Sequence, residues 1–214
     1  TRVRSSAASD VYKRQLEGRR ELLQAGARPV GWKLGTGERE RIGAGPMVGY
    51  LTSASQLPNG GTYRMTADAP LHADAEVALE LGTDGEIAGF GAALELVDLG
   101  GSDDAQQIVA DNVFHRAAIF GPVGPTRPAR AVARLIVDGE VRAQARVPSS
   151  DYPRVVDEVG RLVAAVGDCI RPGDRLITGA VVQVPVEPGD HVIADLGVLG
   201  RAEARISSHI SAVE

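Results

Sequence analysis

The chain has 214 residues, the length of one domain, and this is enough to bury a substantial core. Hydrophobic residues make up 43% and charged residues 24%, ordinary globular values that exclude intrinsic disorder, coiled coil and collagen. The net charge of -5 argues against a nucleic-acid partner, because phosphate binding needs clustered Lys and Arg. No apolar run approaches the length of a membrane-spanning helix, so no membrane partner is expected.

Glycine is abundant, at 26 residues, and aromatic residues make up only 4%. This composition favours a sheet-rich fold with many tight turns and an aliphatic core. The single cysteine, Cys169, excludes an internal disulfide framework and a multi-cysteine metal cluster. With one thiol and no export signal, the expected location is the reducing cytoplasm.

The segment SSAASDVYKRQ at residues 5–15 resembles the translation of a transposase adapter used in sequencing libraries. We therefore expect residues 1–15 to be an adapter artefact or a disordered tail, and residues 16–214 to form a single domain. Deletion of residues 1–15 is expected to leave the melting temperature and activity unchanged. Once they are set aside, Lys33 is the only lysine in the remaining chain.

The first half of the chain reads as one short helix followed by strands. Leu16–Gly26 has helical spacing with a terminal glycine, and His72–Leu81 alternates with period two, which places its carboxylates on one face. A TDG turn at Thr83–Gly85 leads into the next strands. Further short strands are expected at 30–34, 46–51, 86–90 and 92–97, with a loop at 57–61.

The second half adds two helices and a hairpin. Ser102 is a candidate N-cap for a helix that extends to about Arg116, and Asp151 is one for a clearly amphipathic helix to Val166. The Asp138-Gly139 pair predicts a hairpin within residues 131–147. Strands are expected at 175–182, 191–196 and 201–206.

Eight to ten strands against three helices, without regular strand-helix alternation, argue against a parallel doubly wound sheet. The predicted fold class is α+β, a mixed β-roll with flanking helices. Such a roll offers a mouth at which strand ends can deliver functional side chains.

Carboxylates on the predicted strands form a candidate metal site. Asp74 and Glu76 are one strand repeat apart, so they repel each other unless they are protonated, paired with a cation or bridged by a metal. Their oxygens suit Mg²⁺, Mn²⁺ or Ca²⁺. Glu95 lies in an otherwise apolar strand, where a buried charge needs a partner. The alternative for all three is a solvated strand face.

Lys33 is the candidate cationic group. It lies in GWKLG, between glycines that allow close approach of a ligand, and a lysine can hold an enolate or move a proton. The alternative is a surface lysine that codon bias has left behind.

The four histidines are scattered without metal-ligand spacing and are interpreted as structural: His72, His115, His191 and His209. The chain also lacks GxSxG, Walker-type and GxGxxG motifs in a suitable context.

Several segments together resemble the 2-keto-4-pentenoate hydratase branch of the fumarylacetoacetate hydrolase superfamily. They are GWKLG at 31–35, HADAEVALEL at 72–81, ALELVD at 93–98, VADN at 109–112, PGDRLITG at 172–179 and PGDHVIADLGVLG at 188–200. The resemblance covers residues 16–206. It implies the mixed β-roll of the fumarylacetoacetase C-terminal type.

The resemblance also implies a site and a reaction. It places Mg²⁺ or Mn²⁺ on Asp74, Glu76 and Glu95, a catalytic role on Lys33 and substrate binding on Thr178. The implied reaction is addition of water to a 2-hydroxy-2,4-dienoate to give a 4-hydroxy-2-oxo acid, in the catabolism of aromatic meta-cleavage products. The implied assembly is a homo-oligomer, with a decarboxylase paralogue as a further partner.

Three departures from the family pattern leave alternatives open. Asp74 stands where hydratases usually have Glu, Leu99-Gly100-Gly101 replaces an expected Ser-Arg pair, and Met47 follows Pro46 where an acidic residue is common. One alternative is an oxalocrotonate-type decarboxylase, in which Arg64 or Arg116 could bind a second carboxylate. Another is an acylpyruvate-type hydrolase, which requires a His-Glu dyad on an N-terminal helix. A third is a non-catalytic β-roll that acts as a binding or partner subunit.

Overall fold

The computed structural model describes residues 2–35, 46–65 and 70–208. The elements in chain order are α1 (Arg2–Gln24), β1 (Pro29–Gly35), β2 (Met47–Thr52), β3 (Gln56–Leu57), β4 (Gly61–Arg64), β5 (Leu71–Leu81), the 3-10 turn η1 (Thr83–Gly85), β6 (Ile87–Asp98), α3 (Ala105–Ala110), β7 (His115–Gly124), β8 (Val132–Val137), β9 (Glu140–Arg146), α4 (Tyr152–Ala165), β10 (Arg175–Ile177), β11 (Val182–Pro185), β12 (His191–Asp195), η2 (Gly197–Leu199) and β13 (Arg201–Ser207). The stretch 36–45 and His209 lie outside the described residues. No described helix is long and apolar enough to cross a membrane.

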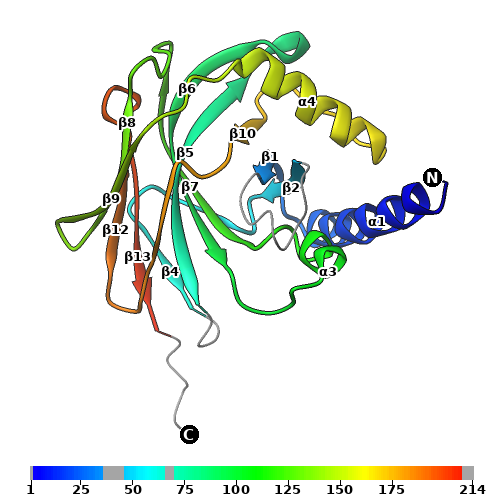
Figure 1. The fold of residues 1–214 in the computed structure, drawn as a ribbon, viewed down its shortest axis with the longest axis horizontal. Coiled ribbons are helices and arrows are strands. Elements are labelled where there is room, and N and C mark those ends of the chain that lie inside the picture. The colour runs from blue at the N-terminus through cyan, green and yellow to red at the C-terminus, as the bar shows by residue number, and fades with distance from the viewer. Residues whose placement is uncertain (1, 36–45, 66–69, 209–214) are drawn as a thin grey trace, which may run out of the picture.

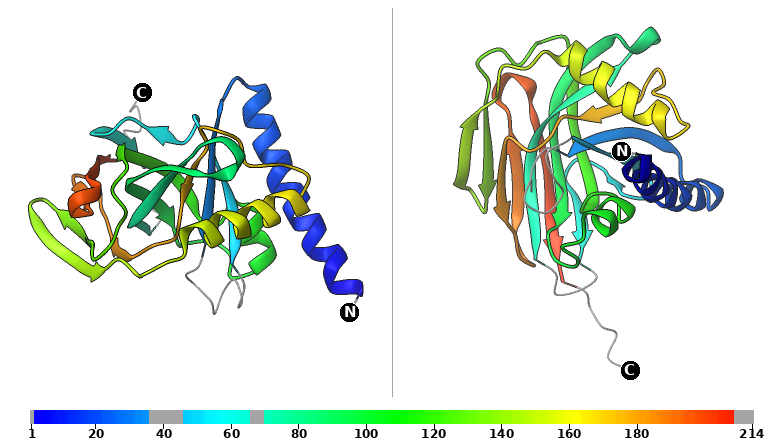
Figure 2. Two further views of the ribbon diagram at one scale, coloured as in Figure 1. Left: turned by 90° about the horizontal axis from the view of Figure 1, so that it is seen from above. Right: turned by 45° about the vertical axis from the view of Figure 1, so that its right-hand side comes forward.

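Two curled sheets pack face to face, and the helices flank the larger one (Figure 1). The eight-stranded sheet has the order β2-β1-β10-β5-β6-β7-β3, with β11 also paired to β5, and it mixes parallel and antiparallel pairs. The five-stranded sheet has the order β4-β13-β12-β8-β9. Figure 2 shows α1 and α4 beyond the larger sheet, at the end of the molecule away from the smaller sheet, and their buried residues Leu16, Val156 and Val159 belong to the same core cluster as Ala73 and Ala75 of β5. This is the predicted α+β class of mixed β-roll with flanking helices.

The two faces of β5 have different environments. The odd positions Ala73, Ala75 and Val77 belong to the main core between the two sheets, together with residues of β8, β12 and β13. The even positions Asp74 and Glu76 therefore face the opposite side of the sheet, because side chains alternate along a strand. The alternation predicted for residues 72–81 is thus confirmed, and it turns the carboxylates toward the concave side of the roll.

The strongest local signals of the sequence are confirmed. The Asp138-Gly139 turn joins β8 and β9, with φ of 51° and 85° as a two-residue hairpin turn requires. Asp151 caps α4 by accepting from Arg154 N. The helix expected from Ser102 to Arg116 is wrong in its extent: Asp104 is the cap and the helix ends at Ala110.

Helix α1 begins at Arg2 rather than at the expected Leu16. Gln15 is 1% exposed, and its Nε2 donates to the carbonyls of Val48 in β2 and Val109 in α3, at 3.0 and 2.9 Å. Further along α1, Arg19 pairs with Asp168 at 2.6 Å. The helix is therefore anchored to three other parts of the chain. The adapter origin of residues 5–15 stays a prediction.

Deletion of residues 1–15 tests how far this anchoring matters. The deletion removes the donor to two carbonyls, and an unsatisfied buried acceptor costs about 1–3 kcal/mol. We therefore expect the free energy of unfolding to fall by roughly that amount, in contrast to the unchanged melting temperature expected from the sequence. Urea titration of the full and shortened chains measures it, and identical midpoints would contradict the anchoring role of Gln15.

Candidate metal centre and active site

Three buried carboxylates meet on the concave face of the larger sheet. Asp74 of β5 is paired directly with Glu95 of β6, and Glu76 follows two residues later on the same face of β5. The exposed fractions of the three residues are 5%, 2% and 2%, so a solvated strand face is excluded. One oxygen from each lies within 4.8 Å of the others. The sequence prediction that Asp74 and Glu76 share a face is confirmed, and Glu95 joins them from the neighbouring strand.

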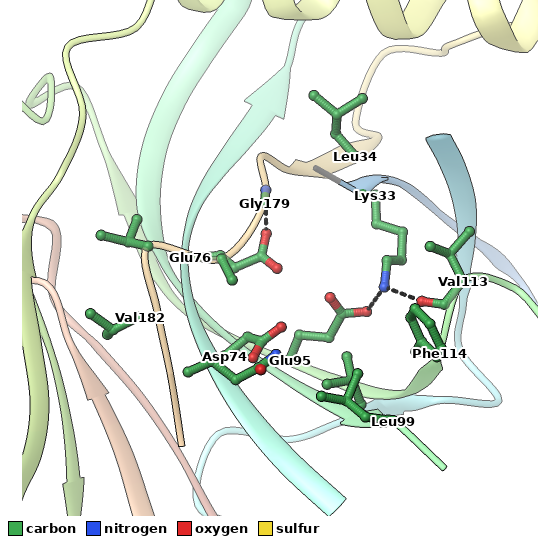
Figure 3. A pocket seen from close by; sticks show the side chains of 15 residues that line it. Lys33, Leu34, Asp74, Glu76, Glu95, Leu99, Val113, Phe114, Gly179 and Val182 are labelled. Atoms are coloured by element: carbon green, nitrogen blue, oxygen red, sulfur yellow. Dashed lines mark hydrogen bonds and ion pairs between the residues drawn. The ribbon is translucent and has the colours of Figure 1, made fainter. Parts of the chain in front are cut away.

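Lys33 reaches the same place from β1, so the interpretation as a surface lysine is wrong. It is 3% exposed, and its Nζ donates to Glu95 Oε1 at 2.5 Å and to the carbonyl of Val113 at 2.9 Å (Figure 3). Gly49 of the neighbouring β2 makes room for the lysine stem, since a Cβ there would lie 2.7 Å from Lys33 Cγ. An ammonium group has three donors. With two bonds to protein, one remains for a ligand in the pocket.

The strand expected over residues 175–182 is interrupted, and the interruption places a backbone donor beside Glu76. β10 ends at Ile177 and β11 begins at Val182. In the gap, the backbone N–H of Gly179 turns to Glu76 and donates to Oε2 at 2.7 Å. A continuous strand would engage that N–H in the sheet, so the break supplies a donor that orients this carboxylate.

The carboxylates have divergent pKa values. Burial raises the pKa of Glu76 well above its usual value, and the nearby Glu95 and Asp74 raise it further. Burial also opposes ionisation of Glu95, but Lys33 and His115 outweigh it and lower its pKa to about 2. Without a cation, ionisation is therefore least favourable at Glu76.

The residues present fit a divalent cation. Three carboxylates against one lysine leave an excess of negative charge in a buried place, which is costly unless it is compensated. Oxygen donors of this kind are those that Mg²⁺, Mn²⁺ and Ca²⁺ prefer. A divalent ion balances the charge when all three carboxylates are ionised and Lys33 is protonated.

The raised pKa of Glu76 determines the sign with which the free energy of unfolding depends on pH. Between its ordinary value of 4.5 and the raised folded value, the folded state binds more protons than the unfolded state. The free energy of unfolding of metal-free protein should therefore fall as pH rises through this window. Urea titrations in chelator at several pH values, compared with Glu76→Gln, isolate this contribution. An equal pH slope in both proteins would contradict it.

The rest of the pocket is largely apolar. Besides the charged residues, the pocket of about 230 Å³ is lined by Leu34, Gly35, Val97, Leu99, Val113, Phe114, Gly179, Ala180, Val181, Val182 and Gln183. Lys33 is the single basic side chain among these described lining residues. Arg116 instead pairs with Asp98 at 3.0 Å, and Arg64 lies on β4 in the other sheet. Neither arginine considered for a second carboxylate lines this pocket.

Thr178 lies at the edge of the site. Its hydroxyl donates to the carbonyl of Val77 at 3.2 Å, and it is the next residue, Gly179, that lines the pocket. Substrate binding by Thr178 stays a prediction.

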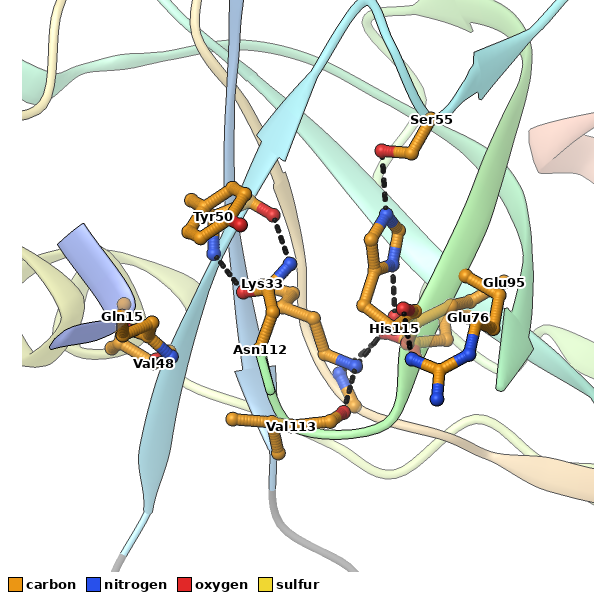
Figure 4. A network of polar contacts seen from close by, with 12 residues as sticks. Gln15, Lys33, Val48, Tyr50, Ser55, Glu76, Glu95, Asn112, Val113 and His115 are labelled. Atoms are coloured by element: carbon orange, nitrogen blue, oxygen red, sulfur yellow. Dashed lines mark hydrogen bonds and ion pairs between the residues drawn. The ribbon is translucent and has the colours of Figure 1, made fainter. Parts of the chain in front are cut away.

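Two residues of the site escaped the sequence interpretation. His115, interpreted as structural, is fully buried and its Nδ1 lies 2.7 Å from Glu95 Oε1 (Figure 4). Burial lowers the pKa of this ring, which disfavours its charged form. The place of His115 at the start of an apolar strand, next along the chain after the strand of Glu95, is the sequence feature that could have indicated this contact.

Asn112 is the other missed residue. Its side chain accepts from Tyr50 N at 2.8 Å and donates to Tyr50 O at 2.9 Å. Asn112, Val113 and Phe114 all have left-handed φ, of 61°, 53° and 64°, a strained run that the clamp on β2 helps to hold. The turn presents the Val113 carbonyl to Lys33.

Comparisons with known proteins place this geometry in context. No family model matches the chain, and no curated protein matches its sequence. Among solved structures, 4-oxalocrotonate decarboxylase from Pseudomonas putida G7, complexed with magnesium and adipate, is 23% identical with a TM-score of 0.78, over 90% of this chain and 83% of that one. Fumarylpyruvate hydrolase from Pseudomonas aeruginosa, in complex with Mn²⁺ and pyruvate, is 17% identical with a TM-score of 0.62, over 83% and 89%.

A third similar structure is 2-keto-3-deoxy-D-arabinonate dehydratase, complexed with magnesium and 2,5-dioxopentanoate. It is 15% identical with a TM-score of 0.62, over 85% of this chain and 74% of that one. These neighbours catalyse different reactions, and all three structures hold a divalent metal. The chain described here therefore has the mixed α+β fold of these metal-bound enzymes.

Proposed function

We propose that this chain is a divalent-metal-dependent hydratase that adds water to a 2-hydroxy-2,4-dienoate to give a 4-hydroxy-2-oxo acid. The observation that carries the proposal is the buried set of Asp74, Glu76 and Glu95 beside Lys33 in a pocket whose other described walls are mainly apolar. The solved neighbours, which include a dehydratase, support an enzyme acting on an oxo acid.

Asp74, Glu76 and Glu95 would hold Mg²⁺ or Mn²⁺. Bound there, the ion supplies Lewis acidity toward the carboxylate and 2-oxygen of the substrate. Lys33 donates its remaining N–H to developing negative charge at the 2-oxygen and is placed to move a proton as the dienol ketonises. The apolar wall shields the conjugated tail, while water adds across its double bond.

The main alternative is decarboxylation of an oxalocrotonate-type diacid, which the similarity to 4-oxalocrotonate decarboxylase favours. A diacid has a second carboxylate that needs a cationic partner. Within the described lining, Lys33 is the single basic side chain and it already serves the carboxylate cluster. This favours a monoacid. The hydrolase alternative is weaker, because the sequence of α1 contains no histidine for the dyad.

A paired substrate assay separates the two reactions. Metal-stripped protein is reloaded with Mg²⁺ or Mn²⁺ and offered either 2-hydroxypenta-2,4-dienoate or 2-oxohex-3-enedioate. The proposal expects metal-dependent loss of the dienol absorbance, with 4-hydroxy-2-oxopentanoate as product, and no CO₂ from the diacid. Release of CO₂ from the diacid, with the monoacid unchanged, would instead establish the decarboxylase.

A further inference from the structure

A chain of hydrogen bonds connects Glu95 to a serine outside the pocket lining. His115 Nδ1 lies 2.7 Å from Glu95 Oε1, and His115 Nε2 lies 2.8 Å from Ser55 Oγ (Figure 4). The side chains of His115 and Glu95 are 3% and 2% exposed. Ser55 lies just before β3, and β3 pairs with β7, the strand that His115 begins. Two paired segments of the larger sheet thus supply the connection.

The bonds around Glu95 define the direction of its carboxylate. Lys33 from β1 and His115 from β7 both meet the same oxygen, Oε1. The other oxygen is left toward the cluster with Asp74 and Glu76, as Figure 3 shows. A glutamate has several rotamers of similar energy, so two donors from different strands select one of them.

Ser55 selects the histidine tautomer that this arrangement needs. Its hydroxyl can donate to Nε2, which leaves the single ring proton of a neutral imidazole on Nδ1, facing Glu95. Among the described lining residues of the pocket, Lys33 is the single basic side chain.

We propose that His115 and Ser55 form a positioning pair that fixes Glu95 for binding of a divalent cation. The inference rests on the proposed metal-dependent function. The atom order Ser55, His115, Glu95 also matches a serine-nucleophile triad, but Ser55 is not part of the described pocket lining and Glu95 is already engaged by Lys33. The pair therefore acts through Glu95 rather than on a substrate.

The test is the dissociation constant of Mn²⁺, measured by calorimetry on wild type and four variants. Loss of a residue that supports a metal ligand costs about 10–100-fold in affinity. We expect His115→Leu to show that loss and Ser55→Ala a smaller one, of about 3–10-fold. His115→Asn, which retains an N–H near the Nδ1 position, should stay within about threefold of wild type. His191→Gln is the matched control, because His191 forms a similar pair with Glu203 at 2.9 Å in the other sheet.

The outcomes separate the two proposals. Unchanged Mn²⁺ affinity in Ser55→Ala and in a folded His115→Leu would overturn the positioning role while leaving the metal centre in place. Should His115→Leu fail to fold, the Mn²⁺ affinity of Ser55→Ala decides. A loss of about 3–10-fold would support the positioning role, and an affinity equal to that of wild type would overturn it. A wild type that binds no Mn²⁺ would overturn both the positioning pair and the proposed function. Labelling of Ser55 by a fluorophosphonate would overturn the positioning role in favour of a nucleophile.

Discussion

Glu76→Gln is expected to abolish metal-dependent turnover while the chain stays folded. The glutamine keeps an oxygen to accept from Gly179 N and presents an amide N–H to Glu95, so it mimics the protonated carboxyl group that the metal-free site prefers. It removes the negative charge that a cation requires. A catalytic metal supplies several kcal/mol of transition-state stabilisation, so the rate should fall by at least about a thousandfold.

The matched control is Glu80→Gln on the same strand. Glu80 pairs with Arg175 at 3.3 Å, and its side chain is 38% exposed, away from the carboxylate cluster. We expect this variant to keep activity within about twofold, as for surface substitutions generally. Full activity of Glu76→Gln at saturating Mn²⁺ would show that the metal assignment is wrong.

Lys33→Arg is expected to lower kcat by at least about a hundredfold, a loss typical of a missing acid-base group. The positive charge is conserved, but a planar guanidinium cannot reproduce the paired contacts to Glu95 Oε1 and Val113 O, and it does not release a proton. Gly49 leaves space for a slim lysine stem and little more.

The Mn²⁺ affinity of Lys33→Arg should fall less than its kcat, because Asp74 and Glu76 keep their positions on β5 and His115 still contacts Glu95 Oε1. Steady-state kinetics and calorimetry on the same preparation measure this difference. Arg142→Lys, on the exposed β9, serves as the control. If any turnover of the wild type persists unchanged in Lys33→Ala, that turnover does not depend on Lys33, and the alternative of a non-catalytic roll is favoured.

Local patterns predicted much of this fold. The period-two alternation of residues 72–81 depends on strand geometry alone, so it correctly placed Asp74 and Glu76 on one face. The Asp138-Gly139 hairpin and helix α4 are also encoded by neighbouring residues. In each case the interaction that determines the structure spans only a few positions.

Features that depend on distant contacts were not predicted. The break after Ile177 frees the N–H of Gly179 to donate to Glu76, which lies 103 positions away in the chain. The early end of α3 at Ala110 depends on the Asn112 clamp to Tyr50, 62 positions away. The role of His115 likewise required knowing that β6 and β7 are neighbours.

The central claim is that Asp74, Glu76 and Glu95 hold a divalent cation, and anomalous diffraction from crystals grown with Mn²⁺ tests it most directly. The account predicts one strong anomalous peak among the three carboxylates, at about 2.0–2.6 Å from an oxygen of each. A map without a peak at this position, or with manganese bound elsewhere on the chain, would contradict it.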